Sequence, residues 1–144
     1  MTSVLTRMVS RALLAPTLVV AAAILVKGYS DVGDGFAAGI VASLGILLQF
    51  VAFGRDEVAG ALPIRHAQAV ALCGLGLGVV VFAAPLLFGG APLEHWPAAE
   101  QEPVHIGSLE LITAVAFDVG VFLLVLGCAV TIINALATTD GDAR

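Results

Sequence analysis

The chain has 144 residues, of which 60% are hydrophobic and only 12% are charged, and its mean hydropathy is +1.07. A typical soluble domain has about 25% charged residues, so this composition excludes a soluble domain and a disordered chain. The net charge of −5, with only six Lys and Arg, also excludes a nucleic-acid-binding protein. We therefore expect an integral membrane protein, in contact with membrane lipid and without nucleic-acid partners.

The first apolar stretch covers residues 8–28, and a helix needs about 20 such residues to cross a bilayer core. Arg7 and Arg11 could instead form the basic region of a signal peptide that is cleaved after residues 21–23. The apolar stretch continues past that position to Val26, which favours a retained first helix.

Three further apolar stretches predict three more membrane helices, at residues 35–53, 69–89 and 106–137. The last would measure about 48 Å at 1.5 Å per residue, so it should tilt or extend beyond the bilayer. No β-hairpin is expected. The sequence therefore predicts an all-α membrane protein, a single domain over residues 1–144 with four transmembrane helices.

The basic residues predict how these helices are oriented. Five arginines fall on one side of a four-span arrangement, and Lys27 falls on the other: Arg7, Arg11, Arg55, Arg65 and Arg144. Lys and Arg concentrate on the cytoplasmic side of membrane proteins. We therefore expect both termini to be cytoplasmic, with the connections 28–34 and 90–105 outside the cell membrane.

Asp118 is the first candidate functional residue, because it lies in the middle of an apolar stretch. A carboxylate at the centre of a membrane helix costs about 2.5–3.5 kcal/mol on insertion scales, so it needs a partner, water or a proton. On one continuous helix, Glu110 would share a broad face with Asp118, about 12 Å away along the axis.

Two interpretations of this pair are open. In the first, Asp118 and Glu110 bind or relay H⁺ or a small cation that enters from the outer side. In the second, Asp118 pairs with a cation on a neighbouring helix and fixes the helix register, and Lys27 is the obvious partner at similar depth.

The outward turn between the first two helices carries two more carboxylates, Asp31 and Asp34. They could contact a cation, but Asp and Gly are also the residues that tight turns prefer, and turn chemistry is the better explanation. Asp34 could instead cap the second helix.

Glycine spacing predicts close contacts between helices. Gly35 and Gly39 form one GxxxG pattern, and Gly74 and Gly78 form another. Small residues at this spacing let helix backbones approach each other in lipid. We expect these four glycines, with Gly120 and Gly127 in the last helix, to lie at helix–helix contacts.

No residue pattern indicates an enzyme. The three histidines, His66, His95 and His105, are not at metal-ligand spacing with Cys or with one another. The sequence also contains no nucleophile elbow or phosphate-binding loop. We therefore expect no catalytic residues, no metal site and no cofactor.

Two stretches resemble the MnhB subunit of the multisubunit Mrp-type (Mnh-type) Na⁺/H⁺ antiporters. The segment KGYSDVGDGFAAG, residues 27–39, is similar to that family's Gly-rich entry to the second helix. The segments IGSLELIT and FDVGVFLLVLG, residues 106–113 and 117–127, are similar to its last helix. Departures from the family pattern occur in the first segment and at Ala114, where the family often has Pro.

This resemblance implies a small accessory subunit of a complex that exchanges Na⁺, or Li⁺ or K⁺, for H⁺ across the cell membrane. Its partners would be large complex I-like subunits and other small hydrophobic subunits. Two alternatives stay open. The chain could be a purely structural assembly subunit of a related redox-driven complex of the membrane-bound hydrogenase type, or an independent homo-oligomeric transporter.

Overall fold

The computed structural model describes residues 3–28, 33–87, 89, 104–106, 109–111 and 113–142. Four long helices dominate the fold: α1 (Val4–Lys27), α2 (Gly35–Phe53), α5 (Ala67–Leu87) and α6 (Thr113–Asp142). The shorter elements are two one-turn helices and two strands: α3 (Arg55–Val58), α4 (Leu62–Arg65), β1 (Val104–Ile106) and β2 (Leu109–Leu111).

The prediction of four helices long and apolar enough to span a membrane is confirmed by the four long helices. Their ends differ from the predicted ones by up to a few residues, except in α6. The helix α1 begins at Val4, earlier than expected, because the Ser3 side chain accepts a hydrogen bond from the Thr6 N–H at 3.2 Å. This contact satisfies one of the free amide groups at the start of the helix.

The last helix begins at Thr113, so the predicted start at residue 106 is wrong. The residues before it pair as antiparallel strands, with His105 opposite Glu110. The physical reason is local: Val-His-Ile and Leu-Glu-Leu alternate apolar and polar residues with the period of a strand, and Gly107-Ser108 between them is a hairpin sequence. Glu110 therefore does not share a helix with Asp118, and the expected common face does not exist.

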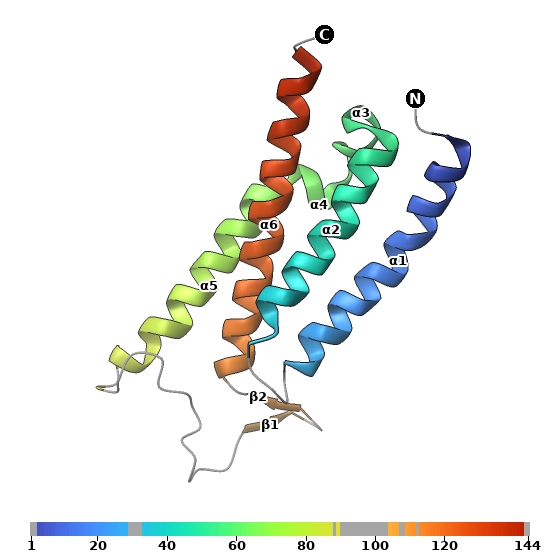
Figure 1. The fold of residues 1–144 in the computed structure, drawn as a ribbon. Coiled ribbons are helices and arrows are strands. Elements are labelled where there is room, and N and C mark those ends of the chain that lie inside the picture. Colours follow the sequence, from blue (N-terminus) through green and yellow to red (C-terminus); the bar gives the residue numbers. More distant parts are fainter. Residues whose placement is uncertain are drawn as a thin grey trace.

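The long helices lie in a row in the order α5, α6, α2 and α1 (Figure 1). α6 packs against both α5 and α2, and α2 packs against α1. Half of the α2 span is buried, against 11% of the α1 and α5 spans. The centre of the molecule is therefore the contact between α2 and α6, and the outer helices present most of their surface to the surroundings.

A hydrophobic core lies near one end of the helices, where α2 ends and α5 begins. Ile46 and Phe50 of α2 meet Val130 of α6, together with Ile64 of α4 and Ala67 at the start of α5. The start of α1 and the end of α6 lie at this same end of the molecule (Figure 1). An even number of spans requires the start of the first span and the end of the last span to lie on the same side of the membrane, whichever side that is.

Glycines set the closest helix contacts. A Cβ atom on Gly74 of α5 would lie 2.6 Å from the Gly120 carbonyl oxygen of α6, and one on Gly127 would lie 2.6 Å from the Ala67 carbonyl oxygen. On Gly39 of α2, a Cβ would lie 2.9 Å from the Val125 side chain. These backbones approach so closely that a methyl group cannot be inserted without moving a helix.

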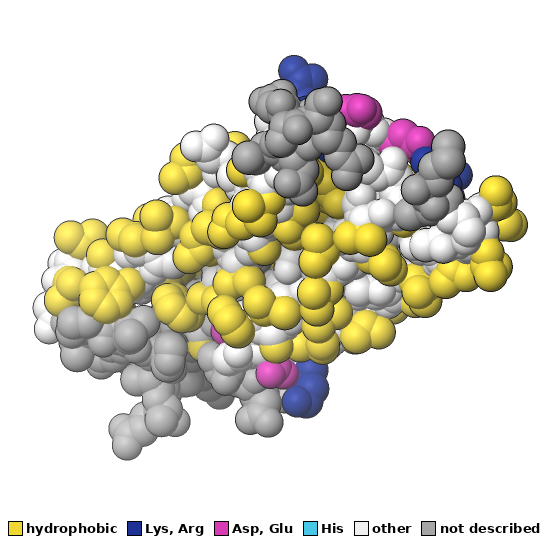
Figure 2. Space-filling view, turned by 45° about the horizontal axis from the view of Figure 1, so that its top comes forward, with side chains coloured by type: hydrophobic (Ala, Val, Ile, Leu, Met, Phe, Trp, Pro, Cys, Tyr) yellow, Lys and Arg dark blue, Asp and Glu magenta, His cyan; other side chains and the backbone are white. Residues whose placement is uncertain are grey.

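Hydrophobic side chains cover the surface in the middle of the molecule, and the charged side chains visible in Figure 2 lie at its margins. Exposed residues include Val19, Leu44, Leu72, Val80 and Leu136. This distribution is typical of a protein whose surroundings are lipid or the apolar faces of other membrane subunits.

Candidate ion site at the start of the last membrane helix

Asp118 lies in the second turn of α6 and is only 4% exposed. The other buried polar residues among those described are uncharged: Ser10, Ser43 and Gln49. A buried carboxylate is expensive unless hydrogen bonds, a countercharge or a bound proton compensate it. Its surroundings therefore decide what Asp118 can do.

The turn that leads into α2 supplies a hydrogen bond to this carboxylate. The backbone N–H of Gly33 donates to Asp118 Oδ2 at 2.9 Å. Gly33 has a φ of 121°, a region that residues with a side chain rarely adopt, so glycine is needed to aim its amide at α6. Asp118 is thus compensated by a peptide dipole.

Two more glycines let the end of α1 and the start of α2 approach Asp118. A Cβ atom on Gly28 would lie 3.0 Å from Asp118 Oδ2. On Gly35, a Cβ would lie 2.9 Å from the Asp118 carbonyl carbon. The end of α1 and the first turn of α2 therefore both touch α6 at the level of this carboxylate.

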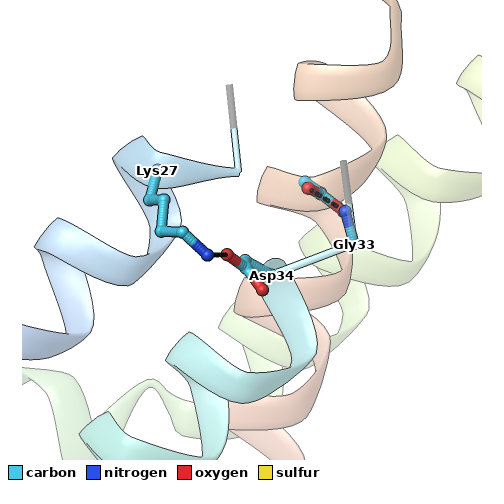
Figure 3. Close-up of polar contacts among 4 residues, drawn as sticks. Lys27, Gly33 and Asp34 are labelled. Atoms are coloured by element: carbon cyan, nitrogen blue, oxygen red, sulfur yellow. Dashed lines mark hydrogen bonds and ion pairs between the residues drawn. The ribbon is translucent and has the colours of Figure 1, made fainter. Parts of the chain in front are cut away.

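Lys27 makes an ion pair with Asp34, between its Nζ and Asp34 Oδ2 at 3.4 Å (Figure 3). The Lys27 side chain is 69% exposed, so it lies at the edge of the protein. The structure thus pairs Lys27 with a residue close in sequence, and not with Asp118, the partner that one of the two interpretations gave it. Asp34 stands at the cap position of α2, where its charge lies at the N-terminus of that helix, but its side chain makes no capping hydrogen bond.

The remaining predicted carboxylates are placed differently. Glu110 lies in β2, at the end of the molecule where α1 ends and α2 and α6 begin (Figure 1). Asp31 lies outside the described residues. Within the parts of the chain that the structure describes, no three His, Cys, Asp or Glu residues gather as a metal site would require.

Comparison with known proteins shows the class of this chain. A family model described as "Domain related to MnhB subunit of Na+/H+ antiporter" matches residues 5–131, which is most of the chain. The chain belongs to the MnhB family. The resemblance found in the sequence is thereby confirmed.

Individual relatives agree with this assignment. The B-type Na(+)/H(+) antiporter subunit of Bacillus subtilis is 33% identical over 117 residues, which cover 81% of this chain and 80% of the relative. The putative antiporter subunit mnhB2 of Staphylococcus saprophyticus is 32% identical, over 79% of each chain. The probable K(+)/H(+) antiporter A/B subunit of Rhizobium meliloti is 34% identical over 84% of this chain, but the match covers only 12% of that longer protein.

The MnhB-family chain contains polar contacts that the sequence did not reveal. One is the Gly33 amide on Asp118, which joins residues far apart in the sequence. Another is a buried hydrogen bond between α1 and α2, in which Gln49 Nε2 donates to the Ser10 carbonyl oxygen at 2.8 Å. The signal for the second was present as a glutamine in an apolar stretch, but its partner is a backbone atom, which no residue pattern identifies.

Proposed function

We propose that this chain is an accessory subunit of a multisubunit cation/proton antiporter, in which Asp118 helps to line or support an ion path. The observation that carries the proposal is a buried carboxylate that accepts a hydrogen bond from the Gly33 amide while Lys27 pairs with Asp34. Ionisable residues inside membrane proteins commonly mark ion or proton routes.

A peptide N–H suits a carboxylate that changes its charge. It can donate to the ionised group and to the carbonyl oxygen of the protonated group, so the hydrogen bond survives either state. A fixed ion pair would hold the carboxylate in its charged form. The Gly33 contact therefore supports a group that can exchange a proton or a cation.

The arrangement of the helices implies that such a path includes other subunits. Four helices in a single row do not enclose a route of their own, and Asp118 lies near the start of α6, one of the two central helices of that row. The Rhizobium meliloti relative is named as an A/B protein, with a B-like region in a longer chain. By analogy, we propose that this chain packs beside an A-type, complex I-like subunit in the cell membrane, with both termini in the cytoplasm.

The second candidate is a purely structural assembly subunit, including one in a redox-driven complex. The glycine contacts along α6 favour it, because they build a rigid scaffold whether or not Asp118 carries ions. The two functions differ in what happens when the charge of Asp118 is removed and its shape is kept.

Asp118→Asn makes this separation, because the amide oxygen can still accept from Gly33. We expect the complex to assemble normally and antiport to fall at least tenfold, measured in everted membrane vesicles with Na⁺ and with K⁺. Assembly is read on native gels. Asp56→Asn, an exposed carboxylate on α3, is the control and should keep wild-type antiport.

Full antiport in assembled Asp118→Asn complexes would leave only the structural function. Loss of the assembled complex with no change in antiport per remaining complex would also contradict the ion-path proposal.

A further inference from the structure

We propose that a groove between the start of α1 and the end of α2 binds the phosphate headgroup of an anionic phospholipid, with Arg7 and Arg11 as its ligands. The groove has a volume of about 540 Å³ and lies where α1 begins and α2 ends, whereas Asp118 lies at the other end of the molecule, where α6 begins (Figure 1). Its lining combines two arginines and one glutamate with apolar side chains: Val4, Arg7, Met8, Arg11, Ala12, Phe53 and Glu57.

Both guanidinium groups contact the same aromatic ring, that of Phe53. Arg7 Cζ lies 5.5 Å from the centre of the Phe53 ring, and Arg11 Cζ lies 5.0 Å from it. Cation–π contacts at these distances restrict both side chains. Each planar guanidinium group can donate a pair of N–H groups to the oxygens of a phosphate, and both line the same groove.

The groove carries a net positive charge. Arg7 forms an ion pair with Glu57, between Nη1 and Oε1 at 3.2 Å. In the part of the chain that the structure describes, no carboxylate lies within ion-pair distance of Arg11. One guanidinium therefore remains to attract an anion, and Arg7 can share its remaining N–H groups with the same ligand.

The position of Arg11 on α1 favours a lipid headgroup over a free anion as the ligand. Residues that follow Arg11 at helical spacing, Ala15, Leu18 and Ala22, are apolar and exposed. They continue from the groove along the membrane-crossing part of α1, where an acyl chain can lie against them. Anionic lipids are attracted to basic residues at the ends of membrane helices. A headgroup in the groove would thus place its chains on an uncovered apolar surface.

The test uses the purified full chain in detergent, with dioleoyl phosphatidylglycerol, dioleoyl phosphatidylcholine or inorganic phosphate added. Native mass spectrometry counts retained lipids, and a thermal melt measures the shift in Tm. We expect the wild type to retain phosphatidylglycerol at least threefold better than phosphatidylcholine. Arg11→Gln should lose this preference, whereas Arg65→Gln, an exposed arginine on α4, should keep it.

Met8→Glu provides a second variant, because it adds a negative charge to the groove and leaves both arginines in place. It should abolish the preference even if Arg11→Gln folds poorly. Equal retention of the two lipids by the wild type would overturn the proposal, as would an unchanged preference in a folded Met8→Glu chain.

Two other results would assign the groove to another ligand and so reject the lipid. One is an Arg11-dependent rise in Tm with inorganic phosphate as large as that with phosphatidylglycerol. The other is release of a partner subunit from the complex by Arg11→Gln with lipid retention unchanged.

Discussion

The contact between α5 and α6 and the contact between α1 and α2 hold neighbouring helices together in different ways. Between α5 and α6, backbone meets backbone at Gly74, Gly120 and Gly127. Between α1 and α2, side chains make the contact: Gln49 bonds to the Ser10 carbonyl, and the Thr17 side chain fills the space over Gly45. In lipid, helices associate through close packing and hydrogen bonds, because apolar burial gives little advantage there.

This difference indicates where the chain should tolerate amino-acid substitutions. A backbone contact cannot adjust to an added methyl group, since no flexible side chain is present to move. A side-chain contact can lose one hydrogen bond and keep its packing. Substitutions in the α5–α6 contact should therefore cost more than substitutions of similar size in the α1–α2 contact.

Gly74→Ala should have the largest effect. Its Cβ would lie 2.6 Å from the Gly120 carbonyl oxygen, so α5 and α6 must separate. Overpacking of this kind typically costs about 1–3 kcal/mol. We expect a loss of that size in the free energy of unfolding, measured by denaturant titration in detergent micelles.

Gly76→Ala is the matched control for this prediction. The same helix receives the same methyl group, but no described atom of another helix lies within 4 Å of the new Cβ. It should be neutral or slightly stabilising, because Ala favours a helix more than Gly does. Equal losses of unfolding free energy in the two variants would show that the effect of Gly74→Ala arises within α5 itself and not from its contact with α6.

Gln49→Leu should have the next largest effect. It removes the donor to the buried Ser10 carbonyl and puts a somewhat shorter, apolar side chain in its place. Hydrogen bonds between membrane helices contribute about 0.6 kcal/mol on average and up to about 1.7 kcal/mol. We expect a loss of about 1 kcal/mol in the same titration.

Gln68→Leu, at an exposed position of α5, is the control for Gln49→Leu and should change the free energy of unfolding by less than about 0.5 kcal/mol. A loss at position 49 as large as that of Gly74→Ala would remove the distinction between the two contacts.

These contacts also show what the sequence could predict. The four helices follow from apolar stretches long enough to span a bilayer, and Asp118 is conspicuous as a charge within one of them. The predicted start of α6 was wrong because the apolar residues at 104–111 alternate with polar ones, and hydrophobicity alone does not distinguish a short strand from the beginning of a helix.

The partners of the charged groups were harder to predict for a physical reason. Similar depth in the membrane suggested Lys27 as the partner of Asp118, but Lys27 forms its ion pair with Asp34, only seven residues away in the sequence. The donor to Asp118 is a backbone amide of Gly33, 85 positions away in the sequence. Every residue except proline has such an amide, so only the packing of the turn against α6 selects this one.

Lys27→Met should have the smallest effect on stability. It breaks the ion pair with Asp34, whose Lys27 side chain is 69% exposed, and exposed pairs contribute about 0–1 kcal/mol. We expect a loss below about 0.5 kcal/mol, and no change in assembly with other subunits. Because Gly33 would still donate to Asp118, antiport should also stay within twofold of wild type. A drop in antiport as deep as that of Asp118→Asn would instead mean that Lys27 and Asp118 act as a pair, and that the turn between α1 and α2 rearranges during transport.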